Sequence, residues 1–155
     1  MNATTHFPGG NGVILSVAEH EGAQLIRVIA EPRNSAESLY WRIKFSGSAG
    51  RPVLVRWCQT QNCLGTGKAE MMRPVWREAG GEWQRATAVT IIPEALGATA
   101  LQFAVPITSG AGEAAFIYPY EEEHLAAALK ANSRWSRQRA ATSSSAGVSV
   151  SRPIT

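Results

Sequence analysis

Apolar and polar residues alternate in short runs along the chain up to Tyr118, and glycine, proline and asparagine separate the runs. The clearest run is Leu39 to Ser46, where every second side chain is apolar, the period of a half-buried strand. The expected strands are Val13 to Val17, Gln24 to Ala30, Leu39 to Ser46, Pro52 to Trp57, Arg73 to Arg77, Glu82 to Ala86, Val89 to Ile92, Leu101 to Ile107 and Ala114 to Tyr118. We therefore expect an all-β fold, an antiparallel β-sandwich of about eight or nine short strands with one C-terminal helix.

Two turns between these runs indicate hairpins. The segment Glu19 to Gly22 separates the first two runs and supplies a glycine for a tight turn. A glycine-rich turn also separates Leu39 to Ser46 from Pro52 to Trp57, and we expect these two strands to pair as an antiparallel hairpin at the centre of the sheet. Trp41 and Phe45 should then lie in the core.

The segment from Phe116 to Ala131 joins the last expected strand to a short helix. Glutamates at 121–123 would occupy the first helical turn, where the helix dipole favours negative charge. Leu125, Ala128 and Leu129 form a narrow apolar stripe at helical spacing. The expected organisation is an irregular N-terminus at residues 1–10, a β-sandwich domain ending in this helix at 11–131, and a basic, disordered tail or linker at 132–155.

The net charge of +3 comes from this tail. Residues 1–131 hold eight Arg and three Lys against twelve Glu, a net charge of −1, whereas the tail holds four Arg and no acid. Because phosphate neutralisation dominates nucleic-acid affinity, the domain gives no sign of a nucleic-acid partner. The sequence has no apolar run long enough for a membrane span and no secretory signal, so we expect a cytoplasmic protein without a membrane partner.

Residues that bind metals or phosphate do not occur here in the required patterns. The histidines His6, His20 and His124 have no metal-ligand spacing, and the chain contains no aspartate. Cys58 and Cys63 lie in a polar stretch without two further ligands nearby, and we interpret them as free thiols. The segment Gly65 to Lys68 lacks the first glycine and the final hydroxyl of a phosphate-binding loop. We therefore assign no catalytic, cofactor-binding or metal-binding residue, expect no cofactor, and expect this chain alone not to be an enzyme.

Aromatic residues offer an alternative function. Exposed tryptophans on a sandwich can stack on sugar rings, as in a free-standing carbohydrate- or ligand-binding module. We favour packing roles instead, with Trp41 and Trp57 in the core and with Trp76 and Trp83 packed on each other across a hairpin. An adaptor acting through the basic tail is a third hypothesis.

Several motifs together resemble the N-terminal β-sandwich domain of cytosolic-type zinc metallocarboxypeptidases. Tyr40 to Phe45 is similar to that family's aromatic "YWFYFRV"-like strand. Arg73 to Trp76 is followed at the family's distance by Trp83 to Arg85. Phe116 to Tyr120, leading into Glu121 to Leu129, resembles the family's "FAYFxPYTYEDL" segment. These motifs cover roughly residues 11–131 in the family's order.

The last ten residues are similar to the "LGxSxxGRPI" with which the family's catalytic domain begins, with Ser151 in place of a glycine and a spacing one residue shorter. In that family the catalytic domain supplies a zinc-binding H-x-x-E, a later histidine, an arginine and a glutamate, and none of those motifs occurs in this sequence. The resemblance implies a non-catalytic accessory domain that assists folding or substrate access. Its expected partner is a metallocarboxypeptidase catalytic domain, in cis or in trans, docking near Phe116 to Ala131.

Overall fold

The computed structural model describes residues 1–31, 40–47, 50–60, 71–119, 124 and 126–130. The chain divides into two compact units, Met1–Pro119 and Tyr120–Thr155. The elements of the first unit are β1 (Asn2–Thr4), β2 (Val13–His20), β3 (Ala23–Ile29), β4 (Arg42–Ser46), β5 (Val53–Trp57), β6 (Val75–Glu78), β7 (Gln84–Arg85), β8 (Thr90–Pro93), η2 (Ala95–Gly97), β9 (Thr99–Val105) and β10 (Ala111–Ala115).

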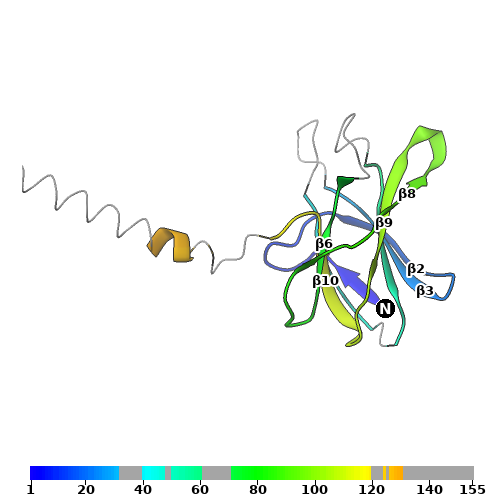
Figure 1. Ribbon diagram of the computed structural model, residues 1–155. Helices are drawn as coiled ribbons and strands as arrows, with labels where there is room; N and C mark the ends of the chain where they lie inside the picture. The colour runs from blue at the N-terminus through cyan, green and yellow to red at the C-terminus, as the bar shows by residue number, and fades with distance from the viewer. Residues whose placement is uncertain (32–39, 48–49, 61–70, 120–123, 125, 131–155) are drawn as a thin grey trace, which may run out of the picture. The chain divides into compact units, whose positions relative to one another are not determined.

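These strands form two five-stranded sheets, which Figure 1 shows as two layers. Sheet A has the order β1-β4-β10-β6-β7, and sheet B has the order β2-β3-β5-β9-β8. All neighbouring strands are antiparallel except β3 and β5, which are parallel. The predicted fold class, an all-β sandwich, is confirmed.

The first predicted hairpin is confirmed. Strands β2 and β3 pair in an antiparallel register from Val13↔Ile29 to His20↔Ala23, with a bulge between Ile14 and Ser16. The turn places Gly22 at φ +79°, a conformation that a side chain disfavours.

The second predicted hairpin is wrong. Strand β4 lies in sheet A between β1 and β10, and β5 lies in sheet B between β3 and β9. Gly47 and Gly50, which flank the connection, both have positive φ, at +86° and +73°. Alternation shows that each of the two strands buries one face. That requirement is met equally well when the strands lie in two facing sheets as when they pair in one sheet, so alternation does not predict the pairing.

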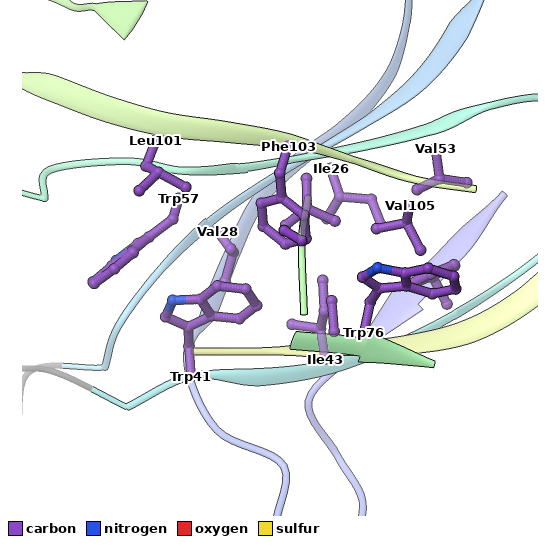
Figure 2. Packing of buried hydrophobic residues seen from close by; sticks show 14 of the residues in the cluster. Ile26, Val28, Trp41, Ile43, Val53, Trp57, Trp76, Leu101, Phe103 and Val105 are labelled. Atoms are coloured by element: carbon purple, nitrogen blue, oxygen red, sulfur yellow. The ribbon is translucent and has the colours of Figure 1, made fainter. Parts of the chain in front are cut away.

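The core lies between the two sheets and is rich in aromatic residues, as Figure 2 shows. Trp41, which precedes β4, and Phe45 are both buried, as predicted. The ring centroid of Trp41 lies 6.1 Å from that of Trp57 and 6.3 Å from that of Phe103. These tilted contacts join sheet A to sheet B, because Trp57 and Phe103 belong to sheet B.

The ends of the first unit differ from the expectation. Asn2 to Thr4, expected within an irregular N-terminus, form the edge strand β1 against β4. Strand β10 ends at Ala115 and not at Tyr118. In the second unit, His124 and residues 126–130 are helical, in agreement with the predicted helix. The predicted tail at 132–155 lies outside the described residues, and no helix among those that are described has the length and apolar character to cross a membrane.

Candidate functional site

The outer face of sheet A carries two rows of side chains that point away from the core. Strand register places Asn2 opposite Ser46 and Ser46 opposite Ala111. The next outward row contains Thr4, Lys44, Glu113 and Arg77, again in register across β1, β4, β10 and β6. The residues between these rows, such as Phe45, point inward, as the period of two requires.

Glu113 is the centre of an ion-pair cluster on this face. Its Oε2 accepts hydrogen bonds from Arg42, at 2.9 Å from Nε and 2.6 Å from an Nη atom. Its Oε1 accepts a hydrogen bond of 3.0 Å from Arg77. Lys44 Nζ lies 3.6 Å from the same oxygen, which is an ion-pair distance rather than a hydrogen bond. Three cations therefore share one carboxylate.

The members of this cluster differ in exposure. The side chain of Arg42 is 4% exposed and that of Glu113 is 10% exposed, whereas the side chain of Lys44 is 45% exposed. Burial raises the pKa of Glu113, but the hydrogen bonds and charges of Arg42 and Arg77 outweigh it, and the net pKa is lower than usual. The carboxylate is therefore fully ionised at neutral pH.

Two aromatic rings flank the cluster. The guanidinium of Arg42 lies 5.3 Å from the ring centroid of Phe7 and 5.5 Å from that of Trp83. Lys44 Nζ lies 4.5 Å from the Phe7 centroid, and the Arg77 guanidinium lies 4.6 Å from the Trp83 centroid. These cation–π contacts hold the cations in place and limit their access to water.

A hollow of about 440 Å³ opens beside Lys44 and Glu113. Its polar lining comes from the two outward rows, at Asn2, Thr4 and Ser46. The remaining wall is made of small and apolar residues, namely Phe45, Ala79, Gly80, Ala111 and Gly112. Because the side chains in this part of the sheet are short, the face is indented here.

A second polar cluster lies on sheet B, around a buried thiol. Arg27 donates a 2.9 Å hydrogen bond to Glu94. Burial raises the pKa of the nearby Cys58 thiol to about 11; Glu94 adds to this effect and Arg27 opposes it. The Cys58 thiol also lies 3.7 Å from the Arg56 carbonyl oxygen. A thiol that is buried and protonated at neutral pH is a poor nucleophile, so this arrangement does not suit covalent catalysis.

The structure does not gather the histidines into a site. His6 is exposed near β1, His20 is partly buried at the end of β2, and His124 is exposed in the second unit. Among the described residues, no three His, Cys, Asp or Glu side chains are grouped so that they could hold a metal ion. Cys58 is a free thiol, and both Cys63 and Gly65 to Lys68 lie outside the described part of the chain.

The four tryptophans that the structure describes occupy packing positions, and Trp135 lies outside the described residues. Trp41, Trp57 and Trp76 are buried in the core. Trp76 and Trp83 do not pack on each other as predicted, because β6 pairs Trp76 with Gln84, and Trp83 instead lies against Arg77 on the outer face. The described residues therefore present no pair of coplanar open aromatic rings of the kind that a sugar platform requires.

Sequence reasoning did not identify the Glu113 cluster. Arg42 and Arg77 are 71 and 36 residues from Glu113 in the chain, so no local spacing links them. One signal was available: Glu113 is a lone charge among the small residues of Ala111 to Ala115, and two cations occupy the polar positions of the clearest predicted strand.

The fold and the described surface define a two-sheet β-sandwich with a buried ion-pair cluster. No family model matches the chain, and no curated protein matches it. Solved structures share its fold. A metallo-carboxypeptidase from Burkholderia cenocepacia matches 84% of this chain with a TM-score of 0.64 and 20% identity. A carboxypeptidase from Burkholderia mallei and a metallo-carboxypeptidase from Pseudomonas aeruginosa each match 84% of the chain with a TM-score of 0.62, at 20% and 18% identity.

The matched region is about a third of each of these solved chains, at 32%, 32% and 33%. The chain therefore corresponds to about a third of the length of the solved chains that it matches. At these identities the likeness establishes the fold, and at that level it confirms the resemblance predicted from the sequence.

Proposed function

We propose that this chain is a non-catalytic accessory β-sandwich that assists the folding or substrate access of a zinc carboxypeptidase catalytic domain. The observation that carries the proposal is the structural match. It covers 84% of this chain but only about a third of the length of each of the bacterial carboxypeptidase chains. The sequence adds support, because it holds no H-x-x-E zinc motif and no aspartate. A catalytic zinc site needs three protein ligands. Among the described residues, no three His, Cys, Asp or Glu side chains lie close enough together to provide them.

The features of the chain at Phe116 and just after it support the proposal that the catalytic domain docks near Phe116 to Ala131. The Phe116 ring lies 5.0 Å from that of Trp57, and its N–H donates to the Trp41 carbonyl oxygen, so the chain is anchored to the core here. The next two side chains, Ile117 and Tyr118, are 49% and 47% exposed. Exposed apolar residues directly after an anchored one suit a contact with a further domain.

The first experiment assays the purified chain for carboxypeptidase activity with added zinc. We expect no turnover, and genuine turnover would refute the non-catalytic assignment. The second experiment reads the coding DNA beyond codon 155 and identifies proteins that co-purify with the chain from its native source. An H-x-x-E motif in cis, or a zinc carboxypeptidase with activity in trans, is expected. If neither is found, the accessory role is wrong.

A cytoplasmic location is part of the proposal, since a free thiol such as Cys58 persists in a reducing compartment. A carbohydrate-binding role has less support, because three of the tryptophans are buried and Trp83 lies against two arginines. Binding of a different kind of ligand has its own evidence, on the outer face of sheet A.

A further inference from the structure

The cation of Lys44 is held differently from the other two cations around Glu113. Arg42 takes one carboxylate oxygen through two hydrogen bonds, and Arg77 lies 3.0 Å from the other oxygen. Lys44 shares that second oxygen from 3.6 Å, with its side chain 45% exposed. An ammonium group has three donors, and one long ion pair uses little of that capacity. Lys44 is therefore the member of the cluster that is placed to contact a ligand.

Two features of the surroundings favour an anionic ligand. The carboxylate of Glu113 is already engaged by two arginines, which reduces its repulsion of a second anion. Phe7 lies 4.5 Å from Lys44 Nζ and limits hydration of the ammonium group on one side. A partly desolvated cation binds an anion more strongly than one fully in water does.

The hollow next to Lys44 indicates the size and polarity of the rest of the ligand. Its volume of about 440 Å³ lies within the range of small-molecule sites. Its lining also includes Ala79, Gly80, Ala111 and Gly112, which offer apolar surface and little bulk. A strongly hydrated inorganic anion gains nothing from such a lining, whereas an aliphatic group does.

We propose that Lys44 and this hollow form a binding site for a small monocarboxylate with an apolar body. The carboxylate contacts Lys44 Nζ, and the side chains of Thr4, Ser46 and Asn2 border the polar part of the site. The apolar body lies over Ala111 and Ala79. The site belongs to the sandwich itself and does not depend on a catalytic domain.

The test uses the full chain, with backbone amide NMR titrations of hexanoate, hexanamide and inorganic phosphate. Hexanoate should shift the amides of Thr4, Lys44, Ser46 and Ala111 in a saturable manner. Hexanamide lacks the charge and phosphate lacks the apolar body, so each should bind about tenfold more weakly than hexanoate or not at all. Absence of saturable hexanoate binding, or equal binding of either control compound, overturns the proposal.

Three variants locate the site. Lys44→Gln should weaken hexanoate binding about tenfold. Arg51→Gln makes the same charge change at a comparably exposed cation that pairs with Glu19, and it should leave binding unchanged. Ala111→Leu keeps Lys44 but fills the hollow, and it should abolish binding with the spectrum otherwise intact. If hexanoate binds Lys44→Gln and Ala111→Leu as it binds the unmodified chain, the proposal is wrong.

Discussion

Arg42 on β4 and Glu113 on β10 meet diagonally across two paired strands. The register places Lys44 directly opposite Glu113 and Ala115 opposite Arg42, yet the closest contact, 2.6 Å, joins Arg42 to Glu113. Diagonal neighbours of this kind are within reach of long side chains. The Arg42 side chain is only 4% exposed, and its attraction to that carboxylate offsets part of the cost of burying its charge.

Removal of this carboxylate should destabilise the fold. We expect Glu113→Gln to lower the free energy of unfolding by about 3–5 kcal/mol, because it removes the charge of a mostly buried carboxylate that accepts hydrogen bonds from Arg42 and Arg77. Glu19→Gln is the matched control, since Glu19 pairs with Arg51 at an exposed site, and it should cost less than about 1 kcal/mol. Urea unfolding followed by tryptophan fluorescence measures both. Equal effects of the two substitutions would show that the cluster contributes no more than a surface pair.

The same residue predicts a pH dependence. The pKa of Glu113 is lower in the folded protein than in the unfolded chain, so its contribution to stability is complete above the unfolded value and is lost as pH falls through the folded one. The stability difference between the unmodified chain and Glu113→Gln should therefore shrink as pH falls below the ordinary glutamate range. Urea titrations at neutral pH and at several acidic pH values check this. A difference that stays constant would contradict the lowered pKa.

Core packing gives a third prediction. Trp41 is fully buried and contacts Trp57 and Phe103, so Trp41→Ala should cost about 3–5 kcal/mol. Phe45→Ala should have a similar effect. Leu96 is fully exposed, and Leu96→Ala should change stability by less than about 0.5 kcal/mol. An unchanged denaturation midpoint in both core variants would refute the core assignment.

Close strand packing gives a fourth prediction, at Gly112. A Cβ atom there would lie 2.6 Å from the Arg77 carbonyl oxygen and 3.1 Å from the Phe45 ring. We expect Gly112→Ala to destabilise the domain by about 1–3 kcal/mol, the usual cost of overpacking. At Gly81 the nearest contact of a Cβ is 3.4 Å, so Gly81→Ala serves as the control and should be nearly neutral. Thermal unfolding distinguishes the two, and equal midpoints would count against the tight contact.

The thiol of Cys58 gives the fifth prediction. Its pKa of about 11 means that little thiolate exists near neutral pH. In a Cys63→Ser background, iodoacetamide should modify Cys58 at least about a hundredfold more slowly than free cysteine at pH 7. The rate should still rise about tenfold per pH unit up to pH 9, because the thiol remains far below its pKa. Mass spectrometry follows the reaction, and modification as fast as that of free cysteine would show that the thiol is accessible and ionised.

Alternation of apolar residues was sufficient to predict the approximate positions of β2 to β9, the fold class and the burial of Trp41 and Phe45. It did not predict that β4 and β5 lie in different sheets, because a period of two specifies which face is buried and not which strand is the neighbour. The edge strand β1 was missed since its three residues carry no apolar pattern.

Local sequence patterns could not predict the candidate site either, for a related reason. Glu113 meets its cations only after the sheet has assembled from segments far apart in the chain. The hollow depends on several short side chains lying next to each other in three strands, which no single stretch of sequence reveals. The sequence did, however, identify both cations of β4 as outward-facing residues of a half-buried strand.

The placement of β4 between β3 and β5 along the chain, but in the opposite sheet, affects the order of assembly. Neither sheet can be completed from consecutive segments, and Arg42 is synthesised 71 residues before Glu113. Since β10 lies between β4 and β6, sheet A can be completed only after this last strand has been synthesised. The strand that completes sheet A is therefore followed directly in the chain by the segment that begins at Phe116.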